Sequence, residues 1–215
     1  MGFVITSNGY VDYLEMVSKK IAENKEYISE LDADTGDGDH WANINMGFKN
    51  ILSLSDELRE QKMDRVFFRI GTIMMSKIGG SSGVLYGGAY MAAGKEIEGK
   101  KEIDSEDMCR CLRAMCIDMC KRGKSEPGYK TMIDALYPAV EMYEKCLIEG
   151  TDEKTCMERV KKASLDGAKA TADMSARRGR ASYRADKGVG HLDPGAVTMS
   201  YQISCLCDYI LEKLL

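Results

Sequence analysis

Hydrophobic side chains along this chain recur three, four or seven residues apart, which is the spacing of amphipathic helices. After a short N-terminal tail, the first run predicts a helix that ends at an acidic stretch; its apolar residues are Tyr10, Leu14, Val17, Ile21, Ile28 and Leu31. Seven further runs predict helices at about 40–54, 64–74, 85–94, 104–119, 132–147, 152–171 and 196–214, with Asp64 as the N-cap of the third helix. No run alternates as a strand does, so the pattern predicts a single all-α domain of eight helices over residues 1–215.

The connection between the last two predicted helices, residues 172–194, is the exception to this compact pattern. Connections of more than twenty residues in a compact domain are usually functional or disordered. This one carries Arg180, His191, Asp193 and Pro194. We therefore expect it to be a functional loop.

Composition and charge exclude several classes of partner. The chain has 30 basic and 34 acidic residues, a net charge of −4, whereas nucleic-acid binding needs a basic surface. No apolar run approaches the ~20 residues of a membrane span. The eight cysteines contain no C-x-x-C pair and no signal peptide opens the chain, so reduced thiols are the simplest account. We expect a cytoplasmic protein that binds neither nucleic acid nor membrane.

Residues 31–40 hold four carboxylates and one of the two histidines, with two glycines between them. Unpaired carboxylates this close repel one another, so the folded chain needs a compensating positive charge. Oxygen ligands at short spacing suit Mg²⁺ or Ca²⁺. Asp32, Asp37 and Asp39 are the candidate ligands, and two Mg²⁺ ions could share them. The alternative interpretation is a solvated helix cap without metal.

Two predicted helices begin directly after glycine-containing loops, at His40 and after residues 79–83. Free N–H groups and the helix dipole make such N-termini natural phosphate sites. We expect His40 to donate to a phosphate oxygen and Arg180 to clamp a phosphate, and we assign no catalytic role to His191. The competing interpretation is that residues 79–83 form only a flexible turn.

Standard nucleotide and calcium motifs do not fit the chain. Gly123-Lys124-Ser125 imitates the end of a Walker A motif, but Asp118 occupies the place of its first glycine. Gly36 and Gly38 lack the third glycine of the dinucleotide fingerprint. The EF-hand spacing also fails.

Five ordered blocks between residues 31 and 196 nevertheless resemble the ADP-binding L subunit of dihydroxyacetone kinases. The resemblance rests on Leu31–Asp32, Gly36 to His40, Asn43 and Gly47-Phe48; on Gly79 to Gly83 with Leu85 to Gly87; on Pro127 to Leu136; on Gly179 to Tyr183; and on Gly190 to Ala196. It implies an antiparallel eight-helix barrel that binds ADP and two Mg²⁺ ions at one end. Asp32, Asp37 and Asp39 match the magnesium ligands of the family.

The resemblance also implies a set of nucleotide-binding residues and of partners. The positions that match are His40, Trp41, Ala42, Asn43, Ser81 and Ser82 at the phosphates, Gly123 and Met132 at the adenosine, Arg180 on the phosphate side, and Asp193, Pro194 and Gly195. In the phosphotransferase-dependent members, bound ADP receives a phosphoryl group from a phosphohistidine of the M subunit. The resulting ATP passes that group to dihydroxyacetone on the K subunit. We expect no indispensable general base in this chain.

Three positions depart from the family pattern: Trp41, Tyr129 and Val84. We expect Trp41 to add bulk at the mouth of the phosphate site, which puts dihydroxyacetone itself in question as the acceptor. Other functions therefore stay open, namely the nucleotide module of an ATP-dependent keto-sugar or fatty-acid kinase, or a nucleotide-loaded subunit that binds a transcriptional regulator. The sequence also leaves a homodimer open.

Overall fold

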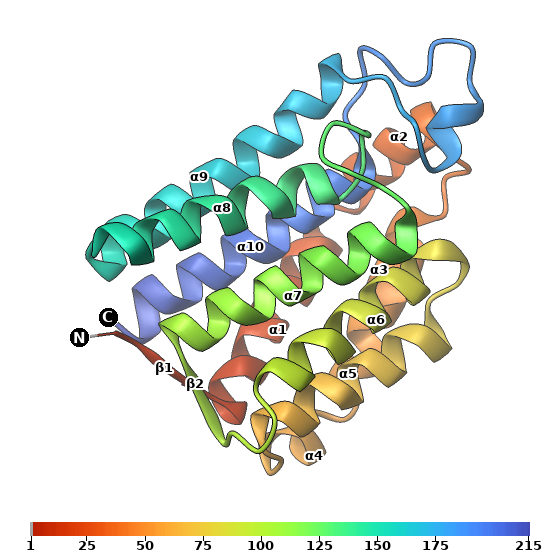
Figure 1. Cartoon of the computed structure of the whole chain (residues 1–215). Coiled ribbons are helices and arrows are strands. Elements are labelled where there is room, and N and C mark those ends of the chain that lie inside the picture. Colours follow the sequence, from red (N-terminus) through yellow and green to blue (C-terminus); the bar gives the residue numbers. More distant parts are fainter. Residues whose placement is uncertain (1) are drawn as a thin grey trace.

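Eight long helices close into an antiparallel barrel in the computed structural model, which describes residues 2–215 (Figure 1). They are α1 Ser7–Glu23, α3 His40–Leu52, α5 Met63–Lys77, α6 Gly80–Glu96, α7 Ser105–Gly123, α8 Ile133–Glu149, α9 Glu153–Ala170 and α10 Pro194–Lys213. Each packs on the next in this order, and α10 packs back on α1. The ring confirms the all-α fold and the eight-helix barrel.

Smaller elements accompany the ring. They are α2 Lys25–Thr35, α4 Ser55–Arg59, two 3-10 turns at Thr171–Asp173 and Arg180–Tyr183, and the strands β1 Val4–Thr6 and β2 Glu102–Asp104. The two strands pair antiparallel, with Ile5 opposite Ile103. The expectation of no strands was therefore wrong. Segments of three residues, exposed at both ends, are too short for alternation to be visible in the sequence.

The predicted first helix is divided in two at Asn24. This residue leaves the helical conformation at φ −107° and ψ 28°, while its side-chain amide donates to Lys20 O at 2.8 Å. Asparagine competes for backbone hydrogen bonds in this way and favours helix ends. The second half, α2, packs on α3 and α10 and carries Asp32 in its last turn.

The prediction of Asp64 as the N-cap of the third helix was also wrong. The helix α5 begins at Met63 with Lys62 as the capping residue, and Asp64 lies buried in its first turn. Its carboxylate accepts from the backbone N–H groups of Arg65 at 2.8 Å and Gly99 at 2.9 Å. Asp64 therefore joins α5 to the turn after α6.

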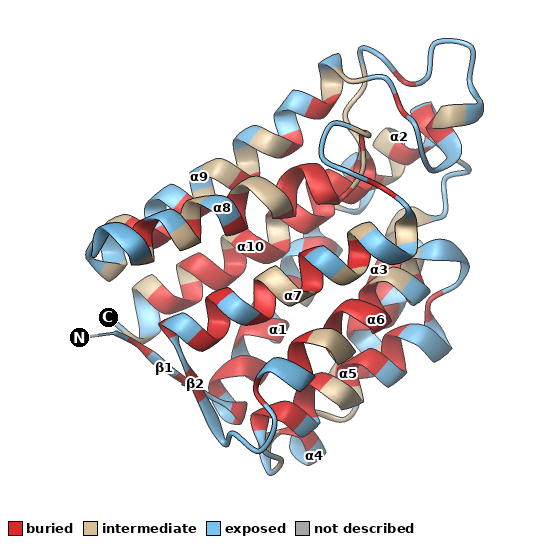
Figure 2. Cartoon of the chain, in the orientation of Figure 1, coloured by how far each residue is buried: buried red, intermediate tan, exposed pale blue. Residues whose placement is uncertain are grey.

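The barrel interior is filled by apolar and aromatic side chains from the inward helix faces, which appear as buried stripes in Figure 2. Tyr10 and Phe67 lie 4.8 Å apart between ring centroids, and Phe67 meets Tyr90 edge-on at 5.8 Å. Tyr86, also buried, accepts a hydrogen bond from Gln202. All eight cysteines are free thiols. The methionine and tyrosine stripes thus serve the core, as the periodicity predicts.

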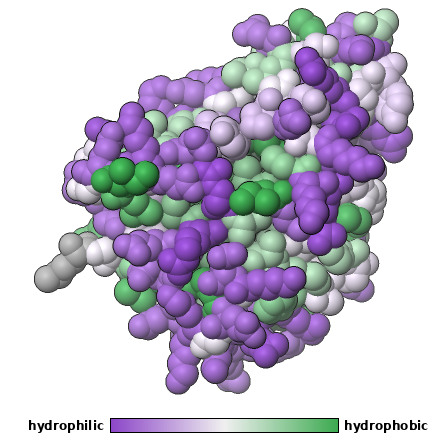
Figure 3. Space-filling view, viewed as in Figure 1, coloured by the Kyte–Doolittle hydropathy of each residue, from purple (hydrophilic) through white to green (hydrophobic). Residues whose placement is uncertain are grey.

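The outer surface is mainly hydrophilic on the face drawn in Figure 3, where the hydrophobic patches are small and separate. Within residues 2–215, no helix combines the length and the apolar character needed to cross a bilayer. At the end of the barrel away from β1 and β2, α2 lies beside the long connection that follows α9 (Figure 1). The cavity described below is at this end.

Candidate functional site

A cavity of about 710 Å³ opens among the loops and helix termini at this end of the barrel. It brings together thirteen of the fifteen residues selected from the sequence: Asp32, Asp37, Asp39, His40, Asn43, Ser81, Ser82, Gly123, Met132, Arg180, Asp193, Pro194 and Gly195. Cavities of several hundred Å³ with a few convergent polar groups are typical ligand sites.

Three carboxylates form an acidic cluster at one end of the cavity. One oxygen each from Asp32, Asp37 and Asp39 lies within 4.8 Å of the others, and of the three side chains only that of Asp32 is buried. Gly36 is needed beside them, because a Cβ atom at this position would lie 2.2 Å from Asp32 Oδ1. A set of oxygen donors this close, from flexible backbone, fits a divalent cation such as Mg²⁺.

The long connection, residues 172–193, reaches across to this cluster. Arg180 Nη2 lies 2.6 Å from Asp37 Oδ2, and His191 Nδ1 lies 3.3 Å from Asp34 Oδ2. Arg180 therefore lines the cavity as expected, but in this structure its partner is a carboxylate of the acidic cluster. We call the cluster together with Arg180 the acidic end of the cavity.

Within residues 2–215, four helices begin at residues that line the cavity, and one of them is α8 at Ile133. The helix α3 begins at His40, α6 at Gly80 and α10 at Pro194. Gly80, the first residue of α6, adopts φ +66°, a value that favours glycine. Ser81 and Ser82 lie in the first turn of this helix. Residues 79–83 are thus mostly helical, where the sequence predicted a loop. The arrangement places several helix dipoles toward one volume, which favours a bound anion.

His40 has contacts that differ from the expectation of a phosphate donor. Its Nε2 lies 2.9 Å from Thr198 Oγ1 on α10, and its backbone N–H donates to Asp32 Oδ2 at 2.9 Å. Burial lowers the pKa of His40, although Asp32 and Asp39 act in the opposite direction. The imidazole is therefore neutral at pH 7 and joins α3 to α10.

Trp41 and Ala42 are absent from the cavity wall. The indole N–H of Trp41 donates to Ile21 O at 3.0 Å, and the Lys25 ammonium lies 4.9 Å from the ring centroid. The ring thus packs against α1 and α2, which corrects the expectation that it adds bulk at the mouth of the site. The periodicity of α3 could not reveal this, because the direction of one side chain depends on the neighbouring helices.

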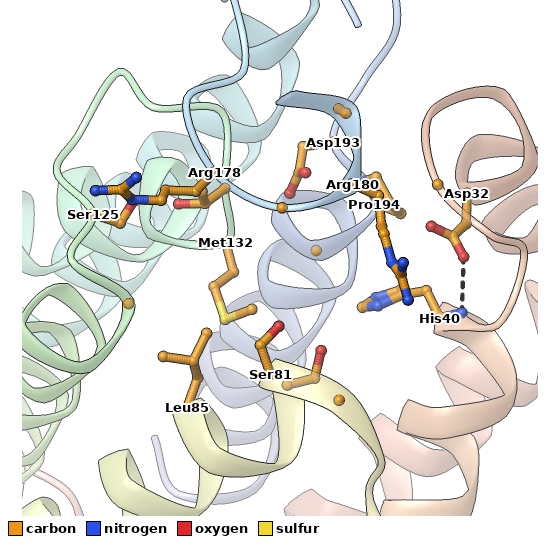
Figure 4. Close-up of a pocket in the computed structure, with 18 of the residues that line it drawn as sticks. Asp32, His40, Ser81, Leu85, Ser125, Met132, Arg178, Arg180, Asp193 and Pro194 are labelled. Atoms are coloured by element: carbon orange, nitrogen blue, oxygen red, sulfur yellow. Dashed lines mark hydrogen bonds between the residues drawn. The ribbon is translucent and has the colours of Figure 1, made fainter. Parts of the chain in front are cut away.

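The cavity also has an apolar wall, to which Leu85, Met119, Met132 and Ile133 contribute, and on this side Arg178 lies beside Ser125 (Figure 4). Gly123 lies beside this wall, since a Cβ atom there would be 3.5 Å from Leu85 Cδ2. Figure 4 shows the two ends, with Asp32 and His40 on one side and Leu85 on the other. We call this wall the apolar end. One cavity therefore offers charged groups and an apolar surface to a single ligand.

Asp193 is the N-cap of α10 and the most perturbed acid of the cavity. Its Oδ2 accepts from the N–H of Ala196 at 2.7 Å. Burial raises the pKa of Asp193 to about 7, and the Ala196 N–H and the Lys130 charge only partly offset this effect. The carboxylate is therefore held at a cap position in surroundings that disfavour its charge.

Lys130 also lines the cavity, and no feature of its own in the sequence pointed to this position. Its side chain is 1% exposed, and its ammonium donates to the carbonyls of Thr171 and His191, at the two ends of the long connection. Burial lowers its pKa. The only signal in the sequence was its place within the block from Pro127 to Leu136, since most lysines are exposed.

The sequence of this chain is similar to a known domain family and to subunits of known kinases. The family model described as the DAK2 domain matches residues 34–208. The ADP-binding subunit DhaL of PEP-dependent dihydroxyacetone kinase 2 from Listeria innocua is 33% identical over 98% of this chain and 96% of its own length. The DhaL subunit of the corresponding Escherichia coli kinase is 29% identical over 91% of this chain and 93% of its own.

A solved structure extends the comparison to the fold. The crystal structure of the dihydroxyacetone kinase from C. freundii in complex with AMP-PNP and Mg²⁺ matches with a TM-score of 0.70 and 26% identity. The match covers 92% of this chain but only 33% of that kinase, so this chain corresponds to about one third of it. With the DAK2 model matching most of its length and DhaL subunits matching nearly all of it, the chain belongs to the DAK2-domain family.

Proposed function

We propose that this chain is the ADP-binding subunit of a phosphoenolpyruvate-dependent dihydroxyacetone kinase and relays a phosphoryl group through Mg²⁺-bound ADP and ATP. The observation that carries the proposal is the cavity, in which an acidic end and an apolar end face one volume. A nucleoside diphosphate with its metal has the same division between charged and apolar parts. The DhaL relatives are named as ADP-binding subunits.

In this proposal Asp32, Asp37 and Asp39 hold two Mg²⁺ ions. When bound, the ions neutralise charge on the phosphates, which is most of what phosphoryl transfer requires. The chain contributes the fixed position of the ligands. Asp32 is held by the His40 N–H, and Gly36 leaves room for its carboxylate.

The phosphates are received by the first turns of α3 and α6, which include the N–H groups of Trp41 and Ala42, the side chain of Asn43 and the hydroxyls of Ser81 and Ser82. Backbone donors at a helix start suit phosphate oxygens without any change in the fold. Arg180 moves from Asp37 to a phosphate oxygen when the metal supplies the positive charge. This exchange is possible because Arg180 is 70% exposed on a loop.

The adenosine lies at the apolar end, between Leu85 and Met132 and next to Gly123. The start of α10, with Asp193, Pro194 and Gly195, closes the cavity on the remaining side. No side chain here needs to act as a general base, because the acceptor hydroxyl belongs to a sugar held elsewhere. We propose that a K-type subunit holds dihydroxyacetone and that a phosphohistidine of an M-type subunit is the donor.

The test is reconstitution of phosphoryl transfer with a K-type subunit and a phosphoenolpyruvate-fed phosphohistidine donor. Asp37→Ala should lower the rate by roughly 100-fold or more, because a ligand of the metal is removed, while far-UV circular dichroism stays unchanged. Asp34→Ala is the matched control: it removes a carboxylate from the last turn of α2, three residues away and outside the acidic cluster, and should retain most of the rate. Equal rates for wild type and Asp37→Ala would refute the metal assignment.

A second function is favoured by the one-chain relatives. L-erythrulose 1-kinase of Mycolicibacterium smegmatis is 29% identical over 93% of this chain, which spans only 35% of that enzyme. A nucleotide module that exchanges its ADP for free ATP would serve such a kinase. Turnover supported by ATP without any phosphohistidine donor would establish this function and exclude the relay.

A further inference from the structure

Ser125 places a hydroxyl group without a partner at the apolar end of the cavity. The residue lines the cavity and is only 4% exposed. Its Oγ atom is buried and neither accepts nor donates a hydrogen bond within residues 2–215. A buried hydroxyl without a partner is unfavourable, because it has lost its bonds to water. Such a group in a cavity wall indicates that a ligand atom completes its hydrogen bonding.

The position of Ser125 separates it from the other buried polar atoms that lack partners. These atoms belong to Asn45, Ser164 and Ser204, and none of the three residues lines the cavity. Among residues 2–215, Ser125 is the one that combines a buried side-chain oxygen without a partner and a position in the wall of this cavity. A Cβ atom at Gly123 would lie 3.6 Å from Ser125 Cβ and 3.5 Å from Leu85 Cδ2, so Ser125 belongs to the apolar end.

The backbone that carries Ser125 is firmly held. The N–H groups of Lys124 and Ser125 both donate to Cys120 O, and Lys124 is left-handed at φ +45°, which closes the C-terminus of α7. Arg178 Nε donates to Lys124 O at 2.8 Å from the long connection. Figure 4 shows Arg178 and Ser125 side by side on this side of the cavity. The backbone at Ser125 is therefore held in place, and the direction of the hydroxyl depends only on rotation about the Cα–Cβ bond.

We propose that the Ser125 hydroxyl hydrogen-bonds the nucleobase of the bound nucleotide and so contributes to the choice of base; the inference rests on the proposed function. The phosphates need the charged groups of the acidic end, which leaves the base for the apolar end. Leu85 and Met132 there offer contact surface but no hydrogen bond. A hydroxyl both donates and accepts, so it matches a polar atom on the edge of a purine ring.

The experiment compares Ser125→Ala with Ser164→Ala in metal-loaded, nucleotide-free protein. Ser164 is the matched control, because its hydroxyl is equally buried and without a partner but lies on α9, outside the cavity. Calorimetry measures the affinities for ADP, 2′-deoxy-ADP and inorganic pyrophosphate. Ser125→Ala should bind ADP and 2′-deoxy-ADP about three- to tenfold more weakly, as expected for one neutral hydrogen bond. Its affinity for pyrophosphate and its melting temperature should stay unchanged.

The other possible outcomes of this experiment each contradict a particular part of the proposal. An unchanged ADP affinity in Ser125→Ala overturns the inference, and so does an equal loss for ADP and pyrophosphate, which would mean a general disturbance of the site. A loss for ADP that vanishes with 2′-deoxy-ADP overturns the assignment to the base, because the ribose 2′-hydroxyl would be the partner. Wild-type protein that binds pyrophosphate but not ADP refutes the proposed function itself, and the inference with it.

Discussion

Replacing Asp193 by asparagine should remove a pH-dependent loss of stability while leaving the fold intact. The carboxylate caps α10 by accepting from the Ala196 N–H, and asparagine caps helices about as well as aspartate does. The backbone N–H of residue 193, which donates to Thr171 Oγ1 at 3.0 Å, is unaffected. The substitution therefore removes mainly the charge that burial disfavours.

The magnitude follows from the pKa of Asp193. Moving a carboxyl pKa from 3.8 to about 7 is worth about 4 kcal/mol. The accessible surface of Asp193 shows that the residue is only half-buried, so solvent screens part of this cost and we expect about 2 kcal/mol. Below about pH 4, the pKa of this carboxyl in the unfolded chain, Asp193 is protonated in both the folded and the unfolded protein and does not lower the free energy of unfolding. Between about pH 4 and pH 7 the unfolded chain releases its proton first, so the wild-type protein loses stability as the pH rises; above pH 7 the loss is complete.

The assay is urea unfolding of wild type and Asp193→Asn at pH 5, 6, 7 and 8, with EDTA to keep the acidic cluster free of metal. The stability of Asp193→Asn minus that of wild type should increase by about 1–2 kcal/mol from pH 5 to pH 8. Other titrating groups cancel in this difference when they are unaffected by the substitution. A difference that is constant with pH, or that decreases, would refute the account of Asp193.

Two further substitutions test how the site is held. Lys130→Met removes the ammonium that bonds both ends of the long connection, so the free energy of unfolding should fall by about 2 kcal/mol. Trypsin should also cut this variant between residues 177 and 184 faster than it cuts the control variant Lys124→Met. Equal cutting rates in the two variants would contradict this account. Gly36→Ala places a Cβ atom against Asp32, so Mg²⁺ affinity measured by calorimetry should fall at least about tenfold. Unchanged affinity would show that the loop adapts at no cost.

The sequence predicted the barrel helices well because each one buries a continuous apolar stripe. Long periodic segments leave little choice between helix and strand. The break at Asn24 was missed because the apolar spacing continues through it from Ile21 to Ile28. Hydrophobic periodicity reports which face is buried, and it does not report whether the backbone hydrogen bonds continue.

The acidic cluster could also be recognised from local spacing, because its three carboxylates lie within eight residues of one chain segment. The positions of the Trp41 and Lys130 side chains could not be recognised in this way. The side chain of Trp41 turns to the carbonyl of Ile21, twenty residues earlier, and Lys130 reaches carbonyls 41 and 61 residues later. Such contacts exist only once the helices have packed, so their residues carry no local pattern.

The position of the chain ends has a practical consequence. The strand β1 and the last turn of α10 lie together at the end of the barrel away from the cavity (Figure 1). A purification tag or a fluorescent protein fused to either end would therefore be held a barrel's length from the site. Surface immobilisation through such a tag would leave the cavity facing the solution. The same geometry allows this barrel to be joined to another domain at either end without rebuilding the loops around the cavity.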